Sequence, residues 1–167
     1  MHWLNEFLKF CRPVSRLTGS EWADAKRFIS LGTAAEPGPW RTYRTPYLQE
    51  PMDAATDKET EKVVLMFASQ VGKSEMLLNI LGYYADQEPS PQLMLQPTVE
   101  MAQAFSKERI APMFRDSPGL AGKLIEGKEG RGTEKKSSTT ILMKHYSGGF
   151  LALVGANSPA GLASRPI

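Results

Sequence analysis

The sequence predicts an α/β fold in which helices flank a mostly parallel sheet. A continuous apolar run over residues 63–68 has the length and composition of a strand that is buried on both faces. An amphipathic helical pattern over residues 74–87 follows it, and a second apolar run, residues 92–96, follows the helix. Together the three form a βαβ unit, so the two strands should be parallel.

Composition limits the number of domains and the kinds of site. A chain of 167 residues with 41% hydrophobic residues has enough apolar material for one domain with a core. A charged fraction of 23% and a net charge of +2 are ordinary for a soluble protein, so any basic site for nucleic acid must be local. The apolar runs are too short for a membrane span, and the first residues do not have the pattern of a signal peptide.

Cysteine and histidine usage excludes two further classes of protein. Cys11 is the only cysteine, and His2 and His145 lie far apart in the chain. The sequence therefore has neither a disulfide framework nor a zinc-binding spacing. A reducing, cytoplasmic setting fits this composition best.

Two helices are expected near the N-terminus. Residues 1–12 carry apolar side chains at helical spacing, and Pro13 ends the expected helix. A second helix is expected over residues 21–29, with Ser20 as its N-cap. Its apolar stripe consists of Trp22, Ala25, Phe28 and Ile29.

An extended arm is expected next. After Gly32, this segment contains four prolines and one glycine up to residue 51, interleaved with aromatic residues. Such a composition suits neither a helix nor a strand. The aromatic residues of this arm are Trp40, Tyr43 and Tyr47. They need a surface on which to pack.

The second half of the chain alternates helices and strands. A helix is expected over residues 99–113, entered through Pro97-Thr98, and a short one over residues 117–125. Two apolar segments, residues 140–146 and 150–155, flank Ser147-Gly148-Gly149 and predict a hairpin or a tight connection between strands.

A polar loop of mixed charge separates these two parts, at residues 126–138. Its basic residues are candidates for contact with a DNA backbone, but three glutamates lie among them. A solvated loop is therefore favoured over a DNA-binding one.

One motif carries a chemical mechanism. Gln70-Val71-Gly72-Lys73-Ser74 lies between the expected strand and the expected helix, where a phosphate-binding loop belongs. Backbone N–H groups of such a loop point at the β-phosphate, and the Lys73 ammonium neutralises phosphate oxygens. The Ser74 hydroxyl is then a ligand of Mg²⁺. Because the triplet from Gly72 to Ser74 also arises by chance, its setting carries most of the weight.

The motif is incomplete in two respects. Phe67 stands where the full pattern has its first glycine. No expected strand ends in the Asp or Asp-Glu that would hold magnesium and polarise the attacking water. His145 ends a strand, but a structural or surface role is favoured there, so we assign it no catalytic role.

Beyond the loop, the chain resembles the terminase large subunits of the lambda-like GpA family, the motors of tailed phages and prophages. The residues that carry this resemblance span some 145 positions, in order: Glu21-Trp22-Ala23-Asp24, Pro46-Tyr47, Gln70 to Glu75, Gln96-Pro97-Thr98, Ala111-Pro112-Met113, Gly148-Gly149 and Gly155 to Leu162.

The resemblance implies a fold and a function. The fold is a P-loop NTPase of the additional-strand type, incomplete at the C-terminus because Ile167 falls just before the strand that carries the Asp-Glu pair. The function is ATP hydrolysis with Mg²⁺ that drives packaging of double-stranded viral DNA, and complete family members also cut DNA. Implied partners are the terminase small subunit and the portal or procapsid, in the cytoplasm of a bacterial host. An inactive, truncated prophage remnant and an unrelated helicase-like P-loop ATPase remain as alternatives.

The resemblance also implies site residues and a division of the chain. Tyr47 would stack on adenine and Gln49 would bind the base edge, although Tyr47 is equally expected as a core anchor. The ATP-binding residues would then be Tyr47, Gln49, Ser69, Gln70, Val71, Gly72, Lys73, Ser74 and Glu75. No arginine lies at residues 68–70, so an arginine finger from the loop is not expected. The chain would divide into an N-terminal helical segment (1–31), an arm that contacts the nucleotide (32–60) and a partial ATPase domain (61–167).

Overall fold

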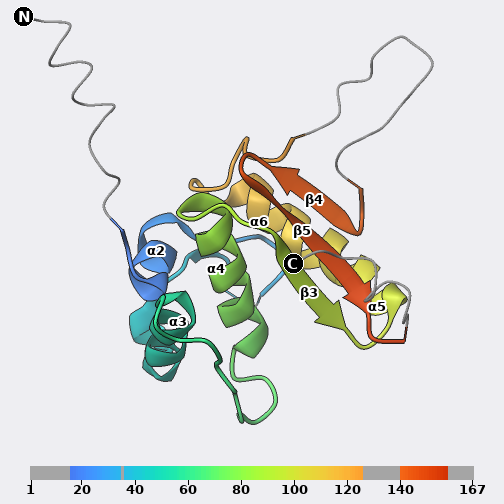
Figure 1. Ribbon diagram of the computed structural model, residues 1–167. Coiled ribbons are helices and arrows are strands. Elements are labelled where there is room, and N and C mark those ends of the chain that lie inside the picture. The colour runs from blue at the N-terminus through green and yellow to red at the C-terminus, as the bar shows by residue number, and fades with distance from the viewer. Residues whose placement is uncertain (1–15, 35, 126–139, 158–167) are drawn as a thin grey trace, which may run out of the picture.

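The computed structural model describes residues 16–34, 36–125 and 140–157 (Figure 1). The helix expected over residues 1–12, the polar loop at 126–138 and the end of the family-like tail after Asn157 lie outside the described residues.

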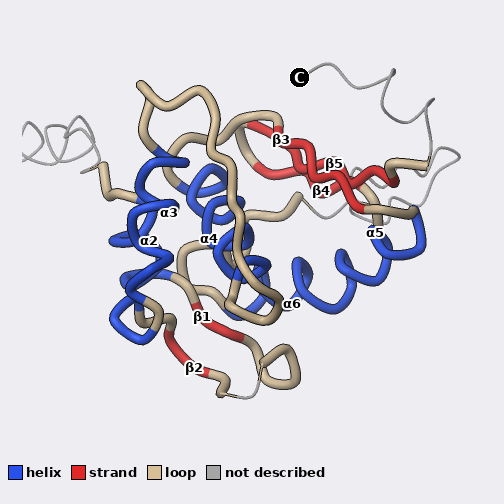
Figure 2. The backbone as a smooth tube through the Cα atoms, turned by 90° about the horizontal axis from the view of Figure 1, so that it is seen from below, coloured by secondary structure: helices blue, strands red, loops and turns tan. Residues whose placement is uncertain are grey.

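The described part of the chain is a mixed α/β structure. Its helices and strands are α2 (Gly19–Lys26), β1 (Phe28–Ile29), β2 (Gly38–Pro39), α3 (Gln49–Thr56), α4 (Lys73–Asp86), β3 (Gln92–Gln96), α5 (Val99–Phe105), α6 (Ala111–Asp116), β4 (Met143–Tyr146) and β5 (Gly149–Gly155). Short 3₁₀ turns span Thr42–Arg44 and Pro46–Leu48, and a π-helical turn, Ser106–Ile110, joins α5 to α6. The run from α5 to α6 lies along the sheet, and α2, α3 and α4 lie together beside the sheet, on the side of strand β3 (Figures 1 and 2).

The main sheet has three strands in the order β3-β5-β4. Strand β3 pairs in parallel with β5, from Gln92 opposite Leu151 to Gln96 opposite Gly155. Strands β4 and β5 are antiparallel and are joined by a tight turn at Ser147-Gly148. The hairpin expected around residues 147–149 is therefore confirmed, as is the strand at 92–96.

The strand expected at residues 63–68 was a wrong prediction. This segment has no regular secondary structure, and the side chains of Val64 and Met66 are 77% and 96% exposed. An apolar run becomes a buried strand only when partner strands saturate its backbone, and the parallel partner of β3 is β5 instead. The sheet holds one parallel and one antiparallel pairing, so it is not mostly parallel.

The second helix begins and ends earlier than predicted. Its N-cap is Thr18, not Ser20: the Thr18 hydroxyl accepts from the Glu21 N–H, and the Glu21 carboxylate accepts from the Thr18 N–H. The Ser20 N–H and hydroxyl donate to Asp53 instead. The helix ends at Lys26, and Phe28–Ile29 form an antiparallel pair with Gly38–Pro39.

Two other element predictions need correction. The expected arm does contain irregular backbone, but it also holds two 3₁₀ turns and runs directly into helix α3. Residues 117–125 form turns and one isolated bridge, Leu124 to Tyr146, rather than a helix. The helix expected over residues 99–113 is present as α5, the π-helical turn and α6, with Thr98 as its side-chain cap.

One core joins the first helix to the helix after the phosphate loop. Trp22 is fully buried and packs on Gly82 of α4, where an added Cβ would lie 2.3 Å from the indole ring. Helix α4 therefore needs glycine at this position to admit the tryptophan. Other fully buried members of the core are Leu48, Met52, Met76, Leu78, Ile110 and Met113.

Candidate functional site

The phosphate loop ends in a left-handed turn at the start of α4. Gly72 is the N-cap of the helix with φ +86°, a conformation that glycine adopts without steric cost, and Gln70 also has a positive φ of 59°. No side chain caps the helix at Gly72. The N–H groups of a 14-residue helix are thus left at a position suited to an anion.

Lys73 and Ser74 are the first two residues of this helix. The Lys73 ammonium donates to the carbonyl oxygen of Phe67, at 3.3 Å, and to that of Ala68. It is therefore turned back onto the segment that leads into the loop. Ser74 is exposed. A bound triphosphate could replace these carbonyl contacts of Lys73 with contacts to phosphate oxygens.

Glu75, the next residue, is held by two arginines. Its Oε2 accepts from Arg27 Nη2 at 2.9 Å and its Oε1 from Arg109 Nη1 at 3.1 Å. The side chain of Arg27 is 2% exposed, and burial lowers the pKa of this guanidinium, an effect that the negative charge of Glu75 opposes. Glu75 faces these cations in the structure.

Tyr47 lies against the phosphate loop. Its hydroxyl donates to the carbonyl oxygen of Val71 at 3.3 Å, and its ring meets that of Phe67 edge to face, with 6.3 Å between centroids. Tyr47 is 51% exposed, so about half of its surface remains accessible. The structure brings Tyr47, Val71 and Lys73 into one region, although residues 47 and 71 are far apart in the sequence.

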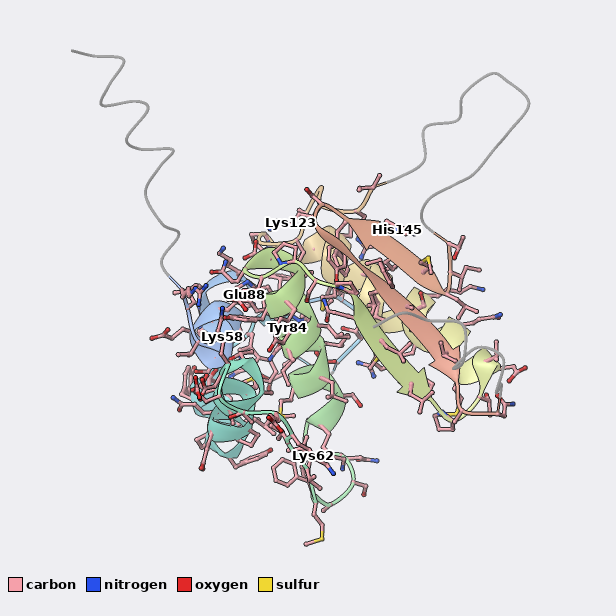
Figure 3. All side chains as sticks on the ribbon, viewed as in Figure 1. Lys58, Lys62, Tyr84, Glu88, Lys123 and His145 are labelled. Carbon is pink, nitrogen blue, oxygen red and sulfur yellow. The ribbon has the colours of Figure 1, made fainter. Side chains whose placement is uncertain are left out.

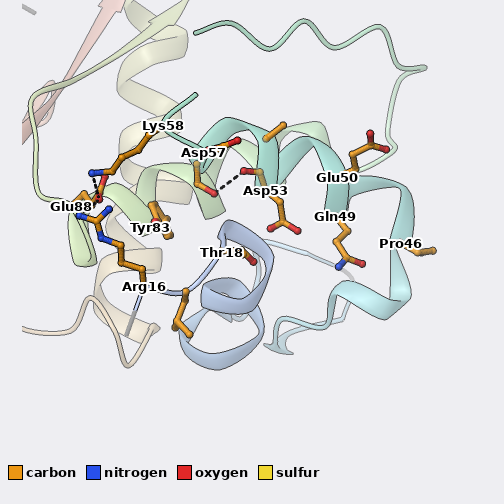
Figure 4. Close-up of a pocket in the computed structure, with 13 residues that line it drawn as sticks. Arg16, Thr18, Pro46, Gln49, Glu50, Asp53, Asp57, Lys58, Tyr83 and Glu88 are labelled. Atoms are coloured by element: carbon orange, nitrogen blue, oxygen red, sulfur yellow. Dashed lines mark hydrogen bonds and ion pairs between the residues drawn. The ribbon is translucent and has the colours of Figure 1, made fainter. Parts of the chain in front are cut away.

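Gln49 lies instead at a separate cavity. Helix α3 begins at Gln49, and this residue helps to line a cavity of about 820 Å³ between α2, α3 and the end of α4 (Figure 4). The lining residues are Arg16, Leu17, Thr18, Pro46, Gln49, Glu50, Asp53, Ala54, Thr56, Asp57, Lys58, Tyr83 and Glu88. At one end of the cavity, Glu88 forms ion pairs with Arg16, at 3.4 Å, and with Lys58, at 3.1 Å. Figure 3 shows Lys58 and Glu88 close together. The phosphate loop does not line this cavity.

Within residues 16–34, 36–125 and 140–157, no group of three or more His, Cys, Asp or Glu side chains could hold a metal ion. None of the helices described there is long and apolar enough to cross a membrane.

Sequence reasoning missed Arg27 and Arg109. They lie 48 and 34 residues from Glu75, so no local spacing connects the three. Of the three residues, only Glu75 was included among the predicted site residues, because it directly follows the loop. Its two arginine partners could be identified only from the fold.

Comparisons with known proteins were consistent with one another. The family model described as phage terminase large subunit gpA, ATPase domain, matches residues 34–167. The chain is 28% identical over 141 residues to the terminase large subunit of Enterobacteria phage P21, covering 84% of this chain and 21% of that protein. It is 29% identical over 132 residues to the terminase large subunit of Escherichia phage lambda, covering 79% and 20% respectively. The chain thus spans about a fifth of the length of these curated relatives. No solved structure matches it significantly.

Proposed function

We propose a function from the premise that this chain belongs to the family of phage terminase large subunits of the gpA type, whose ATPase domain matches residues 34–167. The function is that of the ATP-binding portion of a viral DNA-packaging motor. ATP hydrolysis with Mg²⁺ would drive translocation of double-stranded viral DNA. The family match favours this reading over an unrelated helicase-like ATPase.

The observation that carries the proposal is the setting of Gly72-Lys73-Ser74. The three residues lie inside the matched region, at the N-terminus of a helix that no side chain caps. There the backbone N–H groups of Ser69 to Ser74 would bind the β-phosphate, and the Lys73 ammonium would bind β and γ oxygens. The Ser74 hydroxyl would complete a Mg²⁺ site on the nucleotide.

The base would lie on the side of Tyr47, and a contact from Gln49 to the base would require Gln49 to leave the separate cavity that it lines. The proximity of Tyr47 to Val71 and Phe67 supports an aromatic contact to a purine whose phosphates occupy the loop. Gln49 is two residues further along, at the start of α3. Glu75 would belong to the same site, because it lies in the first turn of α4.

For the whole domain we propose the P-loop fold of the additional-strand type.

The proposal extends to partners and location. By family, the complete protein would act with a terminase small subunit and a portal or procapsid in the cytoplasm of the bacterial host. In that protein, residues 1–31 would form an N-terminal helical segment and residues 32–60 an arm on the nucleotide side, followed by part of the ATPase fold at residues 61–167; the family model includes most of the arm in the ATPase domain, because its match begins at residue 34.

Replacement of Lys73 tests the proposal. Because a charge-assisted contact to phosphate contributes a few kcal/mol, Lys73→Ala should weaken ATP binding by roughly ten-fold or more in titration calorimetry. Lys62→Ala is the matched control, since Lys62 is exposed and precedes the loop (Figure 3). Equal affinities of the Lys73→Ala chain and the wild-type chain would contradict the assignment.

A further inference from the structure

We propose that Arg27 and Arg109 are positioning residues of the phosphate site, which act by holding Glu75 and, with it, the first turn of α4. The inference rests on the proposed function, because it concerns how Lys73 and Ser74 are presented to ATP. Neither arginine has a hydrogen bond or ion pair to residues 69–74 in the structure, so both would act through the glutamate.

The geometry leaves the carboxylate little freedom. Each oxygen of Glu75 has its own guanidinium, Arg27 on Oε2 at 2.9 Å and Arg109 on Oε1 at 3.1 Å, so rotation of the carboxylate breaks at least one contact. The Glu75 side chain is 15% exposed and that of Arg27 is 2% exposed. The pair with Arg27 is therefore costly to break, because each partner would be left as an uncompensated buried charge. The Arg109 side chain is 37% exposed, so its pair with Glu75 is weaker and contributes mainly to the orientation of the carboxylate.

The two arginines come from different parts of the fold. Arg27 is the C-cap residue of α2 and also donates to the carbonyl oxygen of Phe28. Arg109 lies in the π-helical turn between α5 and α6 and also donates to the carbonyl oxygen of Thr33. A π-helical turn inside a helix is frequently found at a functional position. Through Glu75, both segments are joined to the residue that follows Ser74.

This first turn has no other anchor of that kind. Gly72 provides no side-chain cap, Ser74 is exposed, and the Lys73 ammonium contacts only carbonyl oxygens of the preceding segment in the described residues. The hydrogen bonds in these ion pairs are directional, whereas the apolar contacts of Met76, in the same turn, and of Leu78 are not. The Glu75 pairs therefore fix the direction in which the N–H groups and Lys73 point.

The arginines also change the charge beside the phosphates. A carboxylate one residue after Ser74 would repel a polyphosphate, but one glutamate with two arginines has a net charge of +1. Electrostatics alone and positioning consequently predict opposite signs for one substitution. Removing the negative charge in Glu75→Gln should strengthen ATP binding if only charge matters, and should weaken it if the ion pairs position the turn.

The experiment compares ATP and adenosine affinities of the 167-residue chain by titration calorimetry. For Glu75→Gln and for Arg109→Ala we expect ATP binding to be roughly five-fold weaker or more, with adenosine affinity within about two-fold of wild type. The double variant should be no weaker than the weaker single variant, because both changes break the same network. Arg109→Lys should recover only part of the loss, since lysine lacks the planar fork. Arg115→Ala is the control, because Arg115 lies six residues from Arg109 in the sequence and forms its ion pair with the adjacent Asp116, not with Glu75.

The outcomes separate the inference from the function on which it rests. A wild-type chain that does not bind ATP overturns the proposed function and the inference with it. If the wild type binds ATP and Glu75→Gln binds it equally or more tightly, the inference alone is wrong. A loss of ATP and adenosine affinity in equal proportion also overturns it, because that result means general destabilisation. Thermal unfolding of each variant identifies any that do not fold, and Glu75→Gln, which preserves side-chain volume, is the variant least exposed to that failure.

Discussion

Asp86, at the end of α4, joins three elements through one carboxylate. It accepts from the indole N–H of Trp22 at 2.7 Å, from Lys26 at 2.7 Å, and from Lys123. Although burial opposes ionisation, these donors hold the pKa of Asp86 down at about 2. The side chain is 6% exposed, so the contacts are shielded from solvent.

The stabilisation by Asp86 should depend on pH. Its pKa is depressed in the folded state, so its contribution is fully present above the unfolded value near 3.9 and is lost as pH falls towards 2. Asp86→Asn should lower the free energy of unfolding by about 2 kcal/mol at pH 6, and by much less at pH 2.5. Urea unfolding at both pH values measures this. Asp57→Asn, at an exposed aspartate, is the control, and a difference for Asp86→Asn that does not change with pH would refute the explanation.

Tyr47 has two possible roles that substitution distinguishes. If its ring stacks on adenine, Tyr47→Ala should weaken binding of ATP and ADP alike, by about 1 to 3 kcal/mol, and spare inorganic triphosphate. Tyr47→Phe should be nearly silent, because the hydroxyl contact to Val71 is long, at 3.3 Å, and exposed. Unchanged nucleotide affinity together with a lower melting temperature would identify Tyr47 as a core anchor.

At the scale of elements, the apolar segment at residues 63–68 is the main departure from a conventional α/β sheet. Met66 is 96% exposed and Met76, ten residues on, is 1% exposed. Met66→Ala should therefore change the free energy of unfolding by less than about 0.5 kcal/mol, whereas Met76→Ala should cost about 2 to 5 kcal/mol. Chemical denaturation of the two variants provides a matched comparison. Similar costs at both positions would mean that the segment is a buried strand in solution.

At the scale of the whole molecule, the carboxylates of the described residues bear on whether the chain can hydrolyse ATP. The parallel strands β3 and β5 end in Gln96 and Gly155, so neither brings a carboxylate to its C-terminal edge. The carboxylate nearest in sequence to Ser74, Glu75, is occupied by two arginines. ATP hydrolysis needs a group that positions and activates water.

We therefore expect the 167-residue chain to bind ATP without hydrolysing it. Magnesium-dependent release of phosphate should remain at background in a coupled assay, for the wild type and for Lys73→Ala alike. Release that is clearly above background and is abolished by Lys73→Ala would show that a residue of this chain activates the water.

Local patterns in the sequence were sufficient to place several helices and strands along the chain. Helix α4, strand β3 and the β4-β5 hairpin were predicted because apolar spacing and turn residues report directly on backbone conformation. The helix start at Gly72-Lys73 was located for the same reason, whereas the strand expected before it is absent and phosphate binding there stays a prediction. The family, too, could be recognised from ordered motifs.

Tertiary structure decided everything that depends on partners distant in the chain. Residues 63–68 have a strand-like composition, but composition does not specify whether a neighbouring strand is present to satisfy the backbone. The pairing of β3 with β5 and the contacts of Glu75 with Arg27 and Arg109 join residues that are 34 or more positions apart. Such contacts leave no periodic signal, because their energy arises only when folding brings the groups together and removes them from water.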